Sequence, residues 1–218
     1  IGEDVFVECN KLSGVSVAEG NQTFSAPANC NVLMEGTTLR YAFANPVIPK
    51  GTTVIGPNTF KSYCGNADFV VPEGVVSIGN NAFGWSNIKS ISLPSTLKRI
   101  ESFAFQLTQL ESITIPASVE FIGERILNHC SNLTTITVAS DNPLFDSRDK
   151  SNAIIETATN TLIQGCKTTI IPESVTALGT TAFTECQDLT SITIPKSITR
   201  IGEAAFMFCS RLKDDYSL

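Results

Sequence analysis

Proline and phenylalanine recur along this chain with one shared period of 22–23 residues, which constrains the fold more than any other feature. The prolines are Pro49, Pro72, Pro94, Pro116, Pro172 and Pro195. The phenylalanines are Phe60, Phe83, Phe105, Phe183 and Phe206, and Leu127 fills the position where one more is due. Two unrelated residue types with one period indicate stacked repeats, in which each unit buries its apolar residues against the next.

A complete unit has the form Leu189-x-x-Ile192-x-Ile194-Pro195-x-x-Ile198-x-x-Ile201-Gly202-x-x-Ala205-Phe206-x-x-Cys209. The Ile-x-Ile step has period two, which predicts a short strand with one buried face. A unit of this length is too short for a hairpin plus a helix, so it predicts one coil of a solenoid whose strands run parallel, about 4.8 Å apart. Six such strands are expected, at 15–17, 69–71, 91–93, 113–115, 136–138 and 192–194.

The rest of the unit predicts the path of the chain from one Ile-x-Ile strand to the next. Proline ends the strand because it cannot donate to the ladder. A second extended segment follows from three to six residues after the proline, and the glycine after it allows a sharp turn. We expect the Ala-Phe pair in a short helical or 3-10 turn on the convex side, with the rings stacked from coil to coil. The predicted fold is a mostly β solenoid with a parallel sheet on the concave face.

Two long insertions interrupt the plain units, at about 18–48 and 139–171. Each has two apolar stretches around a polar turn, Glu35-Gly36-Thr37 in one and 157–160 in the other, which predicts a β-hairpin that projects from the sheet or extends it. The segment from Asp141 to Asp149 is polar, and we expect a loop there. The chain is expected to be a single solenoid domain over 1–218, and a fragment of a longer chain, because Ile1-Gly2 already matches the middle of a unit.

Composition excludes several classes of protein. Hydrophobic residues make up 42% of the chain and charged residues 17%, which is too apolar for disorder. The net charge is −6, so we expect no nucleic-acid partner. The apolar runs are short, such as Ala153-Ile154-Ile155, and fall far below the roughly 20 residues of a membrane span.

Seven cysteines are present, and four of them share one repeat position. Cys9, Cys130, Cys186 and Cys209 each come three residues after the phenylalanine or Leu127. We interpret this position as a buried small side chain at a turn, with a thiol that donates to a carbonyl. A disulfide between Cys186 and Cys209 stays as an alternative, and no ligand spacing predicts a metal. Cys30 and Cys166 lie in the insertions and indicate local packing, and Cys64 needs a one-residue shift to fit the repeat.

Nothing in the sequence predicts catalysis or a cofactor. His129 is the sole histidine, and its neighbour Cys130 is assigned to the buried repeat position, so we expect a surface histidine rather than a Cys/His pair. Asp141, Asp146 and Asp149 lack the spacing of a calcium loop. Trp85 is expected to pack partly on the convex side, with an exposed contact as the alternative.

The outward positions of the strands are the candidate binding face, because partners usually dock on the concave sheet of a solenoid. They form two columns of small, weakly polar residues: Val70, Ser92, Thr114, Thr137 and Thr193 in one, and Ser90, Ser112, Thr135 and Ser191 in the other. This surface lacks the aromatic and arginine anchors of protein hot spots. It suits either a solvated face or a broad, weak surface that gains strength by repetition.

The unit resembles the BspA-like (Treponema pallidum type) leucine-rich repeats over almost the whole chain. Glu101, Leu127 and Asn66 depart from the pattern at single positions. The resemblance implies an exported, non-enzymatic protein at the cell surface of bacteria or some protists. It also implies adhesion to host extracellular-matrix proteins or to other microbial surface proteins. A passive spacer that presents another domain and a carbohydrate-binding scaffold are the alternatives.

Overall fold

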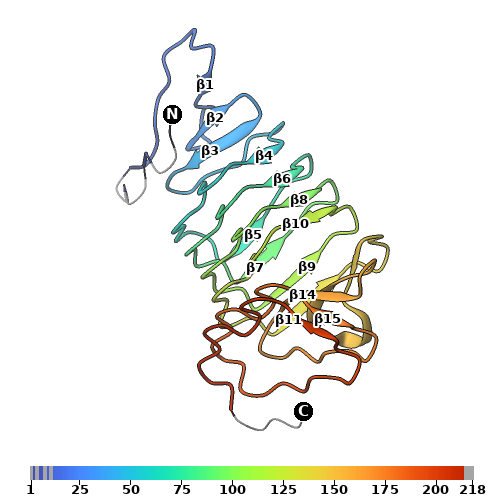
Figure 1. The fold of residues 1–218 in the computed structure, drawn as a ribbon. Coiled ribbons are helices and arrows are strands. Elements are labelled where there is room, and N and C mark those ends of the chain that lie inside the picture. The colour runs from blue at the N-terminus through green and yellow to red at the C-terminus, as the bar shows by residue number, and fades with distance from the viewer. Residues whose placement is uncertain (1, 3–4, 7–8, 10–11, 214–218) are drawn as a thin grey trace.

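The computed structural model describes residues 2, 5, 6, 9 and 12–213. They form a solenoid whose coils stack side by side from the N-terminal to the C-terminal end (Figure 1). The strands are β1 Phe24–Ser25, β2 Val32–Glu35, β3 Thr38–Ala42, β4 Val54–Ile55, β5 Asp68–Val70, β6 Ser77–Ile78, β7 Ser90–Ser92, β8 Arg99–Ile100, β9 Ser112–Ile115, β10 Phe121–Ile122, β11 Thr135–Val138, β12 Phe145–Asp146, β13 Ala153–Glu156, β14 Thr161–Gly165, β15 Ala177–Leu178 and β16 Arg200–Ile201. A 3-10 helix, η1, covers Arg148–Lys150.

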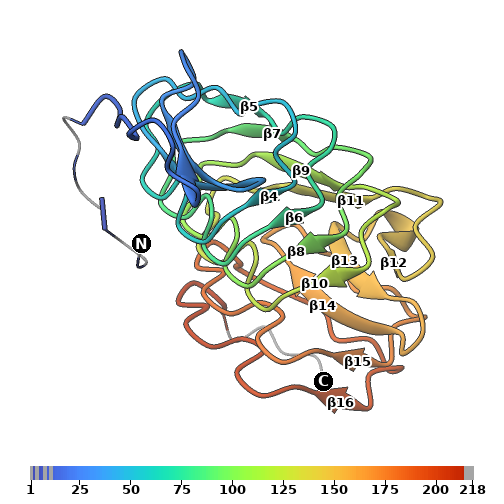
Figure 2. The ribbon, with the colours of Figure 1, turned by 90° about the horizontal axis from the view of Figure 1, so that it is seen from above.

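Two series of parallel strands run along the solenoid, and Figure 2 shows them on different sides of it. The Ile-x-Ile steps form β5 paired with β7 and β9 paired with β11, with Val70 opposite Ser92 and Thr114 opposite Thr137. The segments after the prolines form the second series, in which β4, β6, β8 and β10 are neighbours. The solenoid and both kinds of strand are therefore confirmed.

Two of the six predicted strands are wrong, because 15–17 and 192–194 form no strand. Val15 and Val17 pack beside Leu33, Tyr41 and Phe43, so side-chain burial holds this segment without a ladder. In the coil before 192–194, the N–H of Ile170 donates to the carbonyl of Ser151 at 3.0 Å. This bond joins two segments of the same hairpin-bearing unit. It therefore does not pair Ile170 with the segment 192–194 of the next coil.

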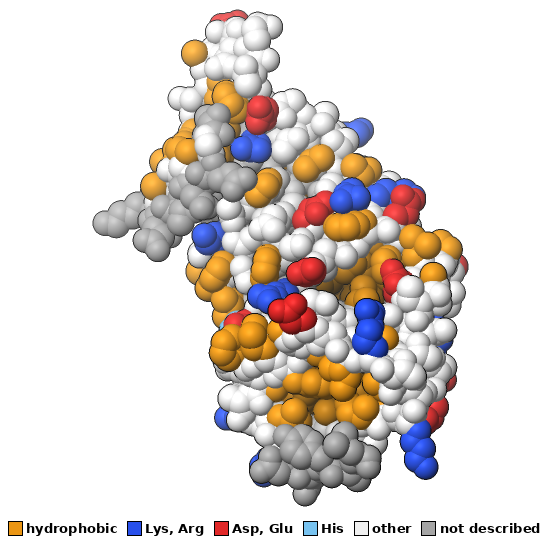
Figure 3. All heavy atoms as spheres, viewed as in Figure 1, with side chains coloured by type: hydrophobic (Ala, Val, Ile, Leu, Met, Phe, Trp, Pro, Cys, Tyr) orange, Lys and Arg blue, Asp and Glu red, His pale blue; other side chains and the backbone are white. Residues whose placement is uncertain are grey.

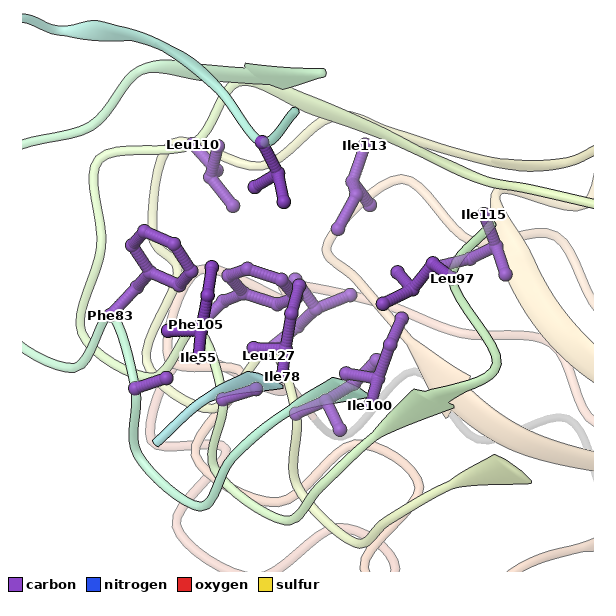
Figure 4. Close-up of a cluster of buried hydrophobic side chains, with 14 of the residues drawn as sticks. Ile55, Ile78, Phe83, Leu97, Ile100, Phe105, Leu110, Ile113, Ile115 and Leu127 are labelled. Atoms are coloured by element: carbon purple, nitrogen blue, oxygen red, sulfur yellow. The ribbon is translucent and has the colours of Figure 1, made fainter. Parts of the chain in front are cut away.

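The predicted column of stacked rings is present in the core. Phe60 and Phe83 stack with centroids 5.0 Å apart, Phe83 and Phe105 follow at 5.6 Å, and Leu127 continues the column (Figure 4). Phe183 and Phe206 stack at 5.1 Å in the C-terminal coils. In these coils, one large apolar side chain per coil therefore covers the next.

The turn that carries the phenylalanine is not helical, which corrects the prediction. The residues two before and two after the phenylalanine have a left-handed backbone, as Asn81 (φ 54°) and Trp85 (φ 57°) do around Phe83. The N–H of Phe60 donates to the carbonyl of Ala82 at 2.7 Å, and that of Phe83 to the carbonyl of Ala104 at 2.8 Å. Hydrogen bonds between coils thus alternate here with local bonds, such as that from the N–H of Gly84 to the carbonyl of Asn81 at 3.1 Å, and together they satisfy the backbone without a helical turn.

The repeat glycine serves close approach rather than a sharp turn, which is a second correction. Gly202 does not have a left-handed φ. A Cβ atom there would lie 2.4 Å from the backbone nitrogen of Thr180 in the preceding coil. Only a residue without a side chain allows this approach.

Both insertions form the predicted hairpins, and each hairpin starts a new sheet. β2 and β3 lead into β4, and β13 and β14 lead into β15. The segment 141–149 is more ordered than the predicted loop, because it holds β12 and the start of η1. The hydrophobic core also divides here, since Ile154 belongs to one buried cluster and Ile155 to the next.

Candidate interaction surface

The outward positions of the Ile-x-Ile steps define a candidate face, which we call the hydroxyl face. Its predicted members are Val70, Ser92, Thr114, Thr137, Thr193, Ser90, Ser112, Thr135 and Ser191. All are exposed except Thr135 and Thr137, which are half-buried. The residues between them, such as Ile113 and Ile136, are buried, so the period-two pattern does separate a core side from an outer side.

Hydroxyl groups on this face form hydrogen bonds across coils. Ser90 Oγ donates to Asp68 Oδ1 at 2.6 Å, and Thr114 Oγ1 lies 2.8 Å from Thr137 Oγ1. The face is weakly polar, and part of its hydrogen-bonding capacity is already used. Charged side chains of both signs are interspersed over the view in Figure 3.

Two residues of the same outward column escaped the sequence analysis. Val47 is 55% exposed and Ile170 is 69% exposed, close to the 68% of Val70. Each lies two residues before a repeat proline, as Val70 does, but inside a hairpin-bearing unit where no Ile-x-Ile step is visible. Counting back from Pro49 and Pro172 would have found them. With them, the column carries apolar side chains at three coils.

His129 and Cys130 are held by different partners, which argues against a catalytic pair. His129 Nε2 lies 2.8 Å from Glu185 Oε2, and both side chains are partly buried. The Cys130 thiol donates to the carbonyl of Phe105 at 3.1 Å. Burial raises the pKa of Cys130 to about 11, so the thiol stays protonated and a poor nucleophile.

The other cysteines of the repeat position differ among themselves. The Cys209 thiol donates to the carbonyl of Phe183 at 3.1 Å, as Cys130 does to Phe105, so the predicted thiol donor is confirmed in two coils. Burial raises the pKa of Cys186 to about 12. Cys9 is exposed, so the expected burial is wrong there. Cys186 and Cys209 are free thiols.

The predicted polar and aromatic candidates form no site of their own. Asp146 pairs with Arg148 at 2.6 Å, and its hydrogen bonds raise the pKa of the guanidinium. Among the described residues, no group of three acidic, histidine or cysteine side chains could hold a metal ion. Trp85 is 47% exposed, with Lys61 Nζ 5.4 Å from its ring centroid. Within the described ranges, no helix has the length and hydrophobicity of a membrane span.

Comparison with known proteins agrees with this architecture. The model of the BspA-type leucine-rich-repeat region matches residues 53–159 and 147–216 in six copies. A leucine-rich cell surface protein from Faecalibacterium prausnitzii is 31% identical, with a TM-score of 0.55 over 67% of this chain and 40% of that one. Among curated proteins, no sequence matches this chain.

Two further solved structures share the fold. The pneumococcal vaccine antigen PcpA has a TM-score of 0.65 at 22% identity, over 76% of this chain and 43% of that one. A leucine-rich-repeat protein from Eubacterium ventriosum has a TM-score of 0.60 at 21% identity, over 80% and 57%. This chain thus spans about half the length of these solved relatives. The chain belongs to the BspA-type leucine-rich-repeat family.

Proposed function

We propose that this chain is a non-catalytic binding scaffold of the cell surface or extracellular space, which acts as one domain and attaches to proteins of a host or of other microbes. The observation that carries the proposal is the hydroxyl face with its exposed apolar column. Val47, Val70 and Ile170 expose more than half of their surface there, while the neighbouring Phe69 and Ile171 are buried. Exposed apolar groups that recur on one face mark interaction surfaces.

Family membership supports the proposal. Leucine-rich-repeat domains generally bind proteins, and their fold is typical of scaffolds rather than enzymes. The relative from Faecalibacterium prausnitzii is itself a cell surface protein. Because each coil adds only a few exposed groups, affinity is expected to come from many weak contacts along the array.

The test measures binding of the chain to immobilised extracellular-matrix proteins and, in parallel, to a panel of glycans. The double variant Val70→Asp/Ile170→Asp places two charges on the hydroxyl face and should abolish protein binding. The control Val76→Asp lies just before β6, beside the other series of strands, at 38% exposure, and should bind normally. Binding to glycans alone would favour a carbohydrate scaffold, and binding to neither would favour a spacer.

A further inference from the structure

The hairpin-bearing unit 142–171 has a shortened turn that opens a notch in the edge of the solenoid. Gly165 takes the phenylalanine position of its coil, because its N–H donates to Ala182 as that of Phe83 donates to Ala104. From Gly165 to Pro172 the chain needs 172 − 165 = 7 residues, whereas Phe83 to Pro94 takes 94 − 83 = 11. The turns of the two flanking coils therefore extend beyond the turn between them.

The notch lies between these flanking turns, and its space, counted together with the solvent at its open mouth, is about 410 Å³. One wall is formed by residues 127–133, the other by residues 184–188, and the floor by residues 164–167. The contact of His129 with Glu185, 2.8 Å long, joins the two walls across the missing turn. The amide of Asn128 also donates to Glu185. The walls are thus held at a fixed separation by side chains from two coils.

The charges in the notch leave one cation without a carboxylate partner. Glu185 Oε2 accepts from the Asn128 amide and lies 2.8 Å from His129 Nε2, and Asp188 accepts from Arg211 at 2.7 Å. Lys167 Nζ donates to the carbonyl of Ser131 at 2.6 Å. Among the described residues, no carboxylate lies within 4 Å of it. An ammonium has three donors, so two remain for a ligand.

We propose that this notch binds a carboxylate group of a protein partner, with Lys167 as the donor. The inference rests on the proposed binding function and names the chemistry of one contact. The carbonyl of Ser131 in one wall holds the ammonium of Lys167, whose side chain extends from the floor, and the apolar Leu127 and Leu133 also line the notch. A hydrogen bond between an ammonium and a carboxylate is charge-assisted, and it is stronger than one between neutral groups. The carboxylate can come from a chain terminus or from an acidic side chain.

The single histidine makes the test direct, because His129 lines the notch and the Hε1 proton of its imidazole gives one NMR signal for the whole chain. Three probes are titrated at constant ionic strength. N-acetyl-Gly-Gly offers a free C-terminal carboxylate, the amide of N-acetyl-Gly-Glu-Gly offers an acidic side chain, and the amide of N-acetyl-Gly-Gln-Gly offers neither. At least one of the first two should shift the signal to saturation, and the third should not. Which one succeeds identifies the source of the carboxylate.

The variant Lys167→Gln should weaken the response about tenfold. Lys167→Arg should keep it, and so should the control Lys196→Gln on an exposed position outside the notch. The proposal is overturned if the neutral probe shifts the signal equally, if Lys167→Gln responds like the wild type, or if no probe acts. These outcomes are separate from the test of the hydroxyl face, which uses whole proteins and different residues.

Discussion

Phe83 lies inside the ring column, and its replacement by alanine tests whether this column holds the coils together. The ring is fully buried and stacks on Phe60 and Phe105 at 5.0 and 5.6 Å. Loss of a buried phenylalanine ring costs about 3–5 kcal/mol. Because both ring faces lose an aromatic partner, we expect Phe83→Ala to lower the free energy of unfolding by about 5 kcal/mol.

The measurement is urea unfolding monitored by circular dichroism. The denaturant slope of each unfolding transition is compared between variants. Phe121→Ala is the matched control, since Phe121 is 37% exposed and its contact is the Arg99 guanidinium, 4.0 Å from its ring centroid. That variant should lose about 1 kcal/mol. A loss for Phe83→Ala below about 2 kcal/mol, or no larger than that of Phe121→Ala, would refute the role given to the ring column.

Four further predictions test other parts of the structure. Gly202→Ala should cost about 1–3 kcal/mol in thermal or urea unfolding, because its Cβ would lie 2.4 Å from the backbone of the preceding coil. Iodoacetamide at pH 8 should label the exposed Cys64 and spare Cys130 in mass spectrometry, and labelling of both at one rate would contradict the burial. The pKa of Cys130 is raised from 9.0 to about 11 in the folded protein. The stability that this shift contributes is therefore complete below pH 9 and is lost as the pH rises through 11. Urea unfolding of the wild type and of a Cys130→Ser variant over this pH range would isolate the contribution. Glu185→Gln should cost about 1 kcal/mol, and a double-mutant cycle with His129→Gln should show coupling between the two sites.

The repeat period was enough to predict the solenoid, four of the six Ile-x-Ile strands and the ring column. Those features depend on which side chains are buried, and burial has a period in the sequence. The backbone of the phenylalanine turn was not predictable in the same way. Asn81 is of a type that tolerates a left-handed conformation, but Trp85 and Phe103 take this conformation although their residue types do not announce it, because hydrogen bonds to the next coil impose it.

The exposed positions of the candidate surface could be predicted where the strands are regular, and they were missed in the hairpin-bearing units. The hydroxyl face follows from alternation along regular strands, so Ser92 and Thr114 were found. Ile170 was missed because the hairpin-bearing unit has no Ile-x-Ile step to count from. The notch around Lys167 depends on the contact of His129 with Glu185, 56 residues away, and no local pattern encodes such a distance.

Ile154 and Ile155 are adjacent in the chain yet face different buried clusters, and this division has a consequence for cooperativity. In a linear array, stability is a sum over units and the interfaces between neighbours. The hairpin-bearing unit is the one place where both series of strands and the core are interrupted together within 53–213. When such an array is pulled from its ends, the coils on one side of this unit can open while the other side stays folded. The insertion thus acts as a mechanical partition, which limits how far a local loss of structure spreads.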